Sequence, residues 1–341
     1  MPNIIGENID RLATVEMRPA TGNLPRGAIN RLYDAVRSKY DAPLVTRVVA
    51  ALESRLSAGD NVVILTGAGG PPFLPNSEID GIPGAVSIAR ALHFGYGVQV
   101  TILTEARAEG SVRATTRAAG MNFRRKDENP ELAHCVVFEA SPIERDACDQ
   151  HAEDILERLN PTAVIAIEKL SPNSAGVIHG TTGLSYDDVH TKPDAYFSRA
   201  AERDILTVGI GDGGNEVGFG VAAEETAKIM PAGQRCLCEC GGGSAAAIAT
   251  DEFMVAAISD WGGYALGAMI AYTTGVRKAM ITPRDVERML YACIDAGALD
   301  GARGTPEVGD DGVPLEGQIA YVSLLNTLVD VASATLESPG H

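Results

Sequence analysis

The segment Thr207–Gly220, TVGIGDGGNEVGFG, holds the densest concentration of residues that could do chemistry. A short apolar run leads into five closely spaced glycines, and Asp212, Asn215 and Glu216 stand among them. Glycine permits positive φ angles and lets a ligand approach the backbone closely. A strand-to-helix turn whose acids only cap the next helix would need fewer of these residues. The pattern therefore predicts an active-site loop.

A second loop rich in glycine and proline runs from Thr66 to Ala85, between the end of an apolar run and the start of a helical pattern. It lacks the Lys-Ser/Thr of a phosphate-binding P-loop, and its glycines do not match the dinucleotide fingerprint, so we expect no nucleotide cofactor. Its four prolines favour a stiff wall over a mobile lid. Glu78 and Asp80 could bind a cation or an amine there, or could simply be turn-forming acids in a solvated loop.

Two further segments carry polar side chains at the ends of apolar runs. Glu168 and Lys169 could act as a base and an anion clamp, or form a surface ion pair worth ~0–1 kcal/mol. His179 follows in a glycine-containing loop, where either a hydrogen-bonding or a ligand-binding role is open. Ser259 and Asp260 could cap a helix or face a ligand.

The three cysteines Cys236, Cys238 and Cys240 alternate along the chain, which would place their thiols on one face of a strand. Several of the six cysteines of the chain lie in apolar runs such as AHCVVFEA, where a reduced, buried thiol acts as a small hydrophobic group. A zinc or iron–sulfur site would call for two-residue spacings and a fourth ligand, so it is less favoured. The sequence also lacks the GxSxG, HExxH, paired CxxC and EF-hand patterns.

The composition limits the classes of partner. The chain has 341 residues and a net charge of −17, which argues against nucleic acid and anionic membrane surfaces. A small anionic substrate remains compatible, because it needs only local positive charge, backbone amides or a bound cation. We recognise no secretory signal and no apolar run of ~20 residues, so we expect a reducing cytoplasmic location. A homodimer is the default expectation for a soluble enzyme.

Continuous apolar runs alternate with helical patterns through most of the chain. The runs begin near residues 62, 98, 135, 163, 205 and 253. This alternation predicts an α/β fold with a doubly wound, mostly parallel sheet and helices on both faces. We expect residues 1–60 to form a helical segment packed on a main domain of residues 61–341. The segment after about residue 276 should cover one edge of the sheet, and its Gly/Asp-rich loop could reach the site.

Ligands bind beyond the carboxyl ends of the strands in such folds. Polar residues follow the predicted strands directly, so one crevice could gather Thr66, Glu105, Glu139, Glu168, Asp212 and Ser259.

Taken in order, these segments resemble the D-glutamate cyclase-like C-terminal domain family. The matching residues are Thr66-Gly67, Glu78, Asp80-Gly81, Gly84-Ala85, Ile167-Glu168-Lys169, Asp212 to Gly220, Ser259 to Gly263, Asp300-Gly301 and Asp311-Gly312. The resemblance covers roughly residues 60–320, and the GDGGNE segment is its most specific part. Lys169 stands where the family has Arg, Asp260 where it has Asn, and Phe219 where Met is usual. These departures bear on the substrate more than on the fold.

The resemblance implies a lyase that dehydrates D-glutamate, or a related dicarboxylate, to a cyclic lactam of the 5-oxo-D-proline type. It suggests Asp212 and Glu216 as ligands of a divalent metal, Mg²⁺ or Mn²⁺, or as base and acid, with Glu168 as a second base. The residues expected to bind the substrate are Thr66, Gly67, Asp80, Gly81, Lys169, His179, Gly213 and Asn215. A lactone or lactam hydrolase, a phosphate-dependent enzyme and a non-catalytic metabolite-binding protein are the alternatives.

Overall fold

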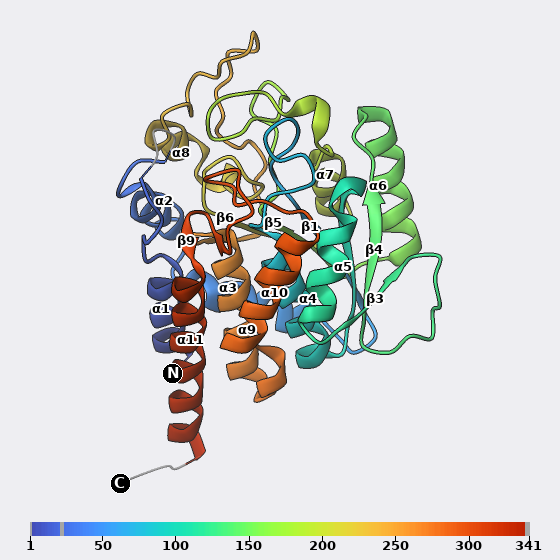
Figure 1. Ribbon diagram of the computed structural model, residues 1–341, viewed down its shortest axis with the longest axis vertical. Coiled ribbons are helices and arrows are strands. Elements are labelled where there is room, and N and C mark those ends of the chain that lie inside the picture. The colour runs from blue at the N-terminus through green and yellow to red at the C-terminus, as the bar shows by residue number, and fades with distance from the viewer. Residues whose placement is uncertain (1, 21–23, 338–341) are drawn as a thin grey trace.

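A seven-stranded parallel sheet, with the order β3-β4-β2-β1-β5-β6-β7, forms the centre of the computed structural model, which describes residues 2–20 and 24–337 (Figure 1). Every neighbouring pair of strands is parallel. The strands are β1 Asn61–Thr66, β2 Gln99–Glu105, β3 Asn122–Arg125, β4 Cys135–Ser141, β5 Ala163–Ile167, β6 Leu206–Gly211 and β7 Glu252–Val255. The predicted parallel α/β sheet is confirmed, and the short edge strand β3 is an addition to it.

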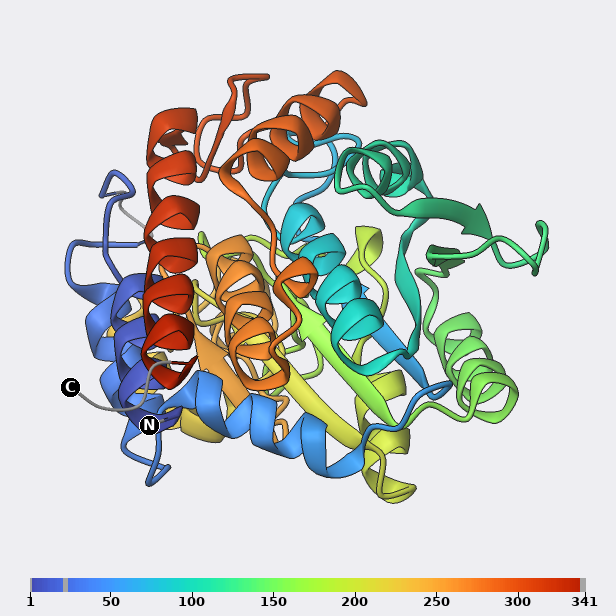
Figure 2. The same ribbon diagram turned by 90° about the horizontal axis from the view of Figure 1, so that it is seen from below.

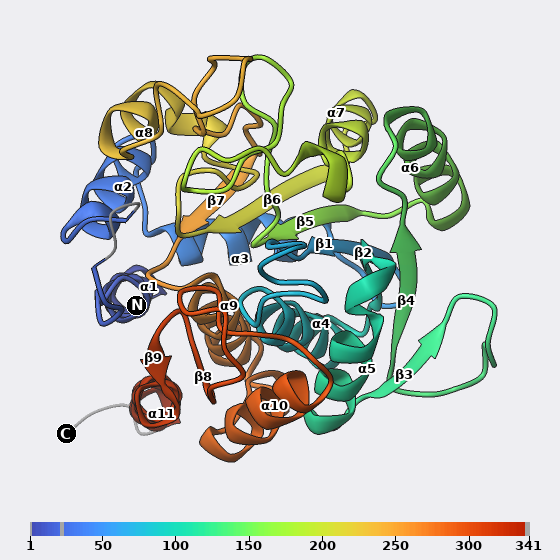
Figure 3. The same cartoon turned by 45° about the horizontal axis from the view of Figure 1, so that its top comes forward.

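Helices cover both faces of the sheet, as its strands require. In β1, Val62 and Ile64 belong to one apolar cluster, with α4 (Ile82–Tyr96) and α9 (Ser259–Thr274). Val63 and Leu65, which point to the opposite face, belong to a second cluster with α6 and α7. The bounds of the last two helices are Arg145–Leu159 and Asp194–Glu202. Figure 3 shows the sheet between these two layers, which confirms the doubly wound arrangement.

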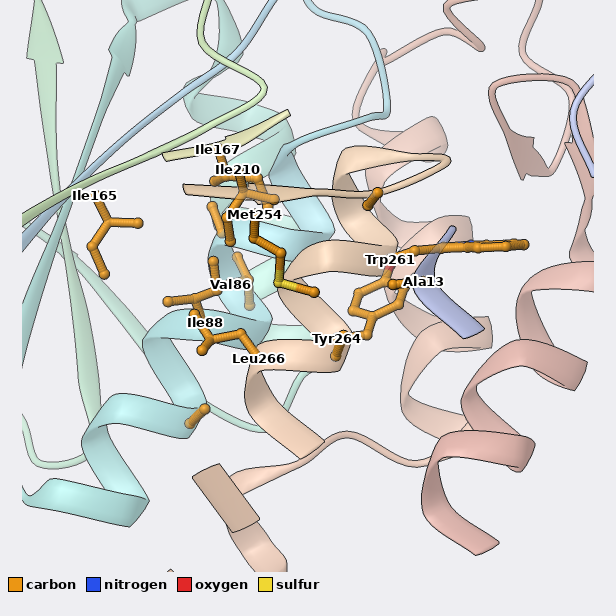
Figure 4. Packing of buried hydrophobic residues seen from close by; sticks show 14 of the residues in the cluster. Ala13, Val86, Ile88, Ile165, Ile167, Ile210, Met254, Trp261, Tyr264 and Leu266 are labelled. Carbon is orange, nitrogen blue, oxygen red and sulfur yellow. The ribbon is translucent and has the colours of Figure 1, made fainter. Parts of the chain in front are cut away.

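Helices α4 and α9 approach each other closely because glycines face each other at their contact. A Cβ atom on Gly263 would lie only 2.7 Å from the Cα atom of Gly84. Beyond this contact, Trp261 of α9 stacks on Tyr321 of α11 (Leu315–Glu337), with ring centroids 4.2 Å apart. Figure 4 shows Trp261 and Tyr264 beside Met254 in this core. The core thus fixes the N-terminal end of α9, where Ser259 and Asp260 lie.

Three N-terminal helices pack beside the β7 edge of the sheet. They are α1 Pro2–Ala13, α2 Ala28–Arg37 and α3 Leu44–Arg55, and they contact α9, β7 and the short helix α8 (Ala223–Ile229). The buried carboxylate of Asp10 joins α1 to α3, because its oxygens accept hydrogen bonds from the backbone N–H groups of Leu44 and Val45. Burial raises the pKa of Asp10 to about 6. The loop between α1 and α2 therefore starts from a fixed position.

The C-terminal segment packs mainly on other helices. Helix α10 (Pro283–Asp295) packs against α5 (Glu109–Ala118), and α11 packs against α9 and α10. Figure 2 shows this outer layer in orange and red. The prediction that this segment covers an edge of the sheet was wrong, because its apolar faces bury against the helical layer. Within the described ranges, no helix has the length and apolar character needed to cross a membrane.

The strand order places a topological switch point between β1 and β5. The chain continues from β1 to β2 on one side and later returns to β5 on the other. The connections that leave these two strands at their carboxyl ends therefore diverge, and ligands in open α/β sheets bind in the crevice that results.

Candidate active site

A cavity of about 230 Å³ lies at the carboxyl ends of β1, β5 and β6. Five separate parts of the chain line it: the segment after α1, the loops after β1, β5 and β6, and the loop between α10 and α11. The lining residues are Arg18, Pro19, Leu24, Ala68, Gly69, Leu74, Glu78, Glu168, Leu170, Gly180, Thr181, Thr182, Tyr186, Asp212, Gly213, Asn215, Glu216, Gly301, Ala302 and Asp311. The C-terminal loop thus reaches the site, as its composition suggested.

The glycine-rich loop after β6 is held in shape by its own acid. Glu216 accepts hydrogen bonds from the backbone N–H groups of Gly213 (Oε1, 2.8 Å) and Asn215 (Oε2, 3.1 Å). The backbone amide of Gly213, which we expected to hold a substrate carboxylate, is therefore already used. Asn215 donates from Nδ2 to the carbonyl of His179 at 2.9 Å, while its buried Oδ1 has no hydrogen-bond partner among the described residues.

Three buried carboxylates meet at the floor of the cavity, where Glu168 and Asp212 line it and Asp80 lies behind the lining. Asp80, Glu168 and Asp212 come from the loops after β1, β5 and β6, and one oxygen of each lies within 4.8 Å of the others. Glu168 has a φ of 44°, an uncommon value for a residue with a side chain, and Ser259 Oγ donates to its Oε2 at 2.5 Å. Asp80 accepts from the backbone N–H of Ser259 at 3.0 Å. Side chains far apart in sequence are thus brought to one point.

Each of these three carboxyl groups has a pKa well above its ordinary value. Burial is the main cause for Glu168, and the charges of Glu216 and Asp212 add to it. Burial also dominates for Asp80, with Asp212 next. For Asp212, burial again raises the pKa, and Arg18 opposes that effect. Such a group favours the protonated form or a cation as its neighbour.

Arg18 is the one cationic side chain among the described residues that line the cavity. Its Nη1 donates to Asp212 Oδ2 at 2.9 Å and also to Asp311, and its Nη2 donates to the Asp212 carbonyl at 3.2 Å. Arg18 is not among the site residues predicted from the sequence. Its local sequence, VEMRPA, has no motif, and only the packing of the N-terminal helices brings it to the loop after β6.

Lys169, which we expected to bind the substrate, is buried beside Glu105 at the end of β2. Its Nζ donates to Glu105 Oε1 at 2.6 Å, and the backbone N–H of Thr191 donates to the same oxygen at 2.8 Å. Burial alone would raise the pKa of Glu105, but Lys169 and His190 hold this pKa well below its ordinary value. Lys169 is not among the cavity-lining residues in the described part of the chain. Its ion pair instead joins the segment after β5 to the end of β2.

Glu139 also lies apart from the cavity, so its expected place in one crevice with Glu168 and Asp212 was wrong. Its carboxylate on β4 accepts hydrogen bonds from Lys126 at 2.6 Å and from Arg158 at 2.7 Å. All these strands run in the same direction, so their carboxyl ends lie at one edge of the sheet. Glu139 is nevertheless distant from Glu168 along that edge, because two strands separate β4 from β5.

The predicted residues Thr66, Gly67 and Gly81 lie behind the lining rather than in it. A Cβ atom on Gly81 would lie 2.6 Å from the Cβ atom of Glu168 and 2.8 Å from Thr66 Oγ1, and the φ of Gly81 is 92°. A Cβ atom on Gly67 would meet Thr104 Oγ1 at 2.7 Å. These glycines therefore allow the backbone to pack directly beneath the carboxylates, and their contribution to substrate binding stays a prediction.

His179 is buried, and its ring faces Cys238 and Cys240 rather than lining the cavity. The segment that carries these thiols consists of bends and turns and is not a strand, so the alternation of the cysteines does not place the thiols on one face of a sheet. The residues that follow His179, Gly180 to Thr182, do line the cavity. The histidine thus supports a wall of the site from behind.

The three floor carboxylates could hold a hard divalent cation. Asp80, Glu168 and Asp212 offer oxygen ligands, which suit Mg²⁺ or Mn²⁺. Of the two acids predicted as metal ligands, Asp212 belongs to this set. Glu216 is occupied by two backbone amides. The roles of both residues stay predictions.

Comparison with known proteins shows the family to which this chain belongs. The sequence model of the family described as "D-glutamate cyclase-like, C-terminal" matches residues 39–326. A human protein named "D-glutamate cyclase, mitochondrial" is 24% identical over 283 residues, which are 76% of this chain and 44% of the human protein. The chain thus spans less than half the length of that relative. Since the family model matches most of the sequence, the chain belongs to the D-glutamate cyclase-like, C-terminal family.

Proposed function

We propose that this protein cyclises D-glutamate, or a closely related amino-dicarboxylate, to a lactam of the 5-oxo-D-proline type, with loss of water. The observation that carries the proposal is the set of buried carboxylates around Arg18 at the switch point of the sheet. The family relationship supports the same reaction class. A cavity of about 230 Å³ also suits a small metabolite better than a nucleotide.

The reaction requires two proton movements. The ammonium group of the substrate must lose one proton so that its nitrogen can attack the γ-carboxylate, and a second proton once the C–N bond has formed. One oxygen of that carboxylate must gain two protons to leave as water. A C–N bond forms and a C–O bond breaks. Paired acids whose surroundings separate their pKa values are suited to such a reaction.

Glu168 and Asp212 differ in the charge of the groups that contact them. Burial raises the pKa of both acids, but only Asp212 has a cation, Arg18, that opposes this rise, so Asp212 is the acid of the pair assigned as the base that accepts the amine proton. Glu168 accepts a hydrogen bond from neutral Ser259 and has no cation in its described hydrogen bonds and ion pairs, so it holds a proton that it can deliver to the leaving oxygen.

A carboxylate is a poor electrophile, so the site must also offset its charge. Arg18 lines the cavity and can face one substrate carboxylate. A divalent cation held by Asp80, Glu168 and Asp212 would supply further positive charge for the other. A cation held there would take the place of the proton on Glu168, and Glu78, whose carboxyl group lines the cavity and has a pKa raised well above its ordinary value by burial, would then be the proton donor.

The direct test is to treat the protein with a strong chelator, add D-glutamate with or without Mg²⁺ or Mn²⁺, and follow 5-oxoproline by mass spectrometry. L-Glutamate serves as the matched control substrate. We expect product from the D-isomer, and loss of that product in the Asp212→Asn variant. Absence of product under every condition would overturn the proposal. Saturable binding of D-glutamate without product would favour a metabolite-binding protein, and hydrolysis of 5-oxo-D-proline alone would favour a lactam hydrolase.

A further inference from the structure

Four side chains that could bind a soft metal ion converge behind the wall of the cavity. His179 comes from the loop after β5, while Cys236, Cys238 and Cys240 come from the loop between α8 and β7. One ligand atom from each lies within 4.8 Å of all the others. The fourth ligand that the cysteine spacing itself did not provide thus comes from a distant part of the sequence.

The distances between these atoms are those of a small coordination shell. Cys236 Sγ lies 3.6 Å from Cys238 Sγ and 3.4 Å from Cys240 Sγ. His179 Nε2 lies 3.2 Å from Cys238 Sγ and 3.8 Å from Cys240 Sγ. Zinc bound to sulfur at about 2.3 Å and to nitrogen at about 2.0 Å in a tetrahedron separates its ligand atoms by roughly 3.5–3.8 Å. The four atoms therefore already have nearly the required spacing.

The histidine is held in the tautomer that a metal ligand needs. Its Nδ1 lies 2.9 Å from the carbonyl oxygen of Val177, which can only accept a hydrogen bond, so Nδ1 carries the hydrogen. In the neutral ring, Nε2 then presents its lone pair to the thiols. Metal-binding histidines commonly donate their other ring nitrogen to a backbone carbonyl in this way.

A second polar contact suits sulfur atoms that carry negative charge. Asn173 donates from Nδ2 toward Cys240 Sγ at 3.4 Å, and its Oδ1 accepts from the backbone N–H of Ala175 at 2.9 Å. The amide is therefore fixed by its own turn, with an N–H group directed at a thiol. Such N–H groups stabilise thiolates bound to a metal.

Packing alone does not explain why the cysteines converge. The loop has no helix or strand between Cys236 and Cys240, and Leu237, between two of the cysteines, is 72% exposed. Cys238 and Cys240 are only partly buried. Small hydrophobic side chains would instead be expected within an apolar core.

We propose that His179, Cys236, Cys238 and Cys240 bind one Zn²⁺ in a closed, structural site. Four protein ligands leave no open position, which distinguishes such a site from a catalytic one. The thiols lose their protons as the metal binds. The inference is independent of the reaction proposed above, because these ligands are separate from the floor carboxylates.

The zinc would join the loop after β5 to the loop after α8. Gly180 to Thr182, which line the cavity, follow His179 directly, and Asn215 donates to the His179 carbonyl at 2.9 Å. A second backbone hydrogen bond, from Leu237 N to Gly183 O at 2.9 Å, joins the same two loops. Zinc binding therefore holds one wall of the cavity against the glycine-rich loop after β6.

The test is elemental analysis of the full chain, expressed with zinc in the medium and purified without chelator. We expect about one zinc per chain, and loss of most of it in Cys238→Ser. Cys135→Ser is the matched control, because Cys135 is also partly buried but lies on β4, outside the cluster. Zinc-free native chain, or equal loss in the control, would overturn the site.

Two measurements on the unmodified chain avoid dependence on the folding of a variant. Co²⁺ added to metal-stripped protein should give thiolate-to-cobalt charge-transfer bands and the intense visible bands of tetrahedral cobalt, and one equivalent of Zn²⁺ should remove them. Alkylation followed by mass spectrometry should find Cys236, Cys238 and Cys240 protected only while metal is bound. A disulfide within the trio in freshly purified protein, or no cobalt bands, would overturn the proposal.

Discussion

Arg18 donates from Nη1 to Asp212 Oδ2 at 2.9 Å, although the two residues are 194 positions apart in sequence. Asp212 lies in the most specific motif of the family, while Arg18 lies outside residues 39–326, to which the family model matches. The cation that faces the buried acids is thus contributed by a segment outside the matched region. The N-terminal helices therefore help to build the cavity.

Replacing Arg18 by Met should impair both folding and activity. The change leaves Asp212 buried without its cation, and removal of one partner of a buried ion pair costs about 3–5 kcal/mol. The loss of unfolding free energy should be smaller at low pH, because the carboxylates left without their cation then take up protons. The free energy of unfolding by urea at two pH values measures this. Arg31→Met, at an exposed position of α2, is the control, and an equal effect in both variants would contradict the assigned role.

Asp212→Asn and Glu216→Gln should differ in their effects. Asp212→Asn removes a proton acceptor from the cavity, so activity should fall at least a hundredfold, while the loss of stability should be smaller than in Arg18→Met because Arg18 keeps its ion pair with Asp311. Glu216→Gln turns one acceptor of a backbone N–H into a donor, which should destabilise the protein by about 1–3 kcal/mol. The two variants are compared by measuring the melting temperature and the turnover rate of each. A stable, inactive Glu216→Gln variant would instead show that Glu216 acts in the chemistry.

Two glycines of α9 should respond oppositely to substitution by alanine. A Cβ atom on Gly263 would meet the backbone of Gly84 at 2.7 Å, so Gly263→Ala must separate α4 from α9 at a cost of about 1–3 kcal/mol. At Gly267 the nearest atom is 3.5 Å away, which leaves room for a methyl group. Gly267→Ala should therefore be neutral, or stabilising by up to about 1 kcal/mol. The midpoint of unfolding by denaturant is measured for both variants. Equal midpoints would refute the close contact between Gly263 and Gly84.

The metal-free protein should lose stability as the pH rises above the ordinary range of a carboxyl group. Glu168 has a pKa raised well above 4.5 in the folded state, mainly by burial, so the folded form binds a proton that the unfolded form has lost. The stability due to this proton is fully present below about pH 4.5 and is lost as the pH rises through the higher folded pKa. Asp260, whose pKa is raised to about 7, acts in the same direction.

Glu168→Gln, which imitates the protonated acid, isolates this effect. The melting temperatures of the parent and variant should agree near pH 5, and the variant should be the more stable near pH 8. Mg²⁺ or Mn²⁺ should stabilise the parent at high pH and the variant less. A difference between the two proteins that does not change with pH would exclude Glu168 as the titrating group.

Local patterns were enough to predict much of the fold. Apolar runs such as NVVILT are buried on both faces of a sheet, and the glycine and acids that follow them mark the ends of strands. The same rule placed Glu168 and Asp212 at one edge, because parallel strands end together. It failed for Glu139, since the order of strands depends on chain crossovers that no local pattern records.

The sequence by itself determined the parallel sheet, the acid-rich glycine loop after β6 and the family, because each depends on residues that are neighbours along the chain. Tertiary structure alone decided that Arg18 faces Asp212, that Lys169 pairs with Glu105, and that His179 meets the three thiols. These contacts form when helices and loops pack to bury apolar surface. Packing brings together side chains whose separation in sequence carries no information about their separation in space.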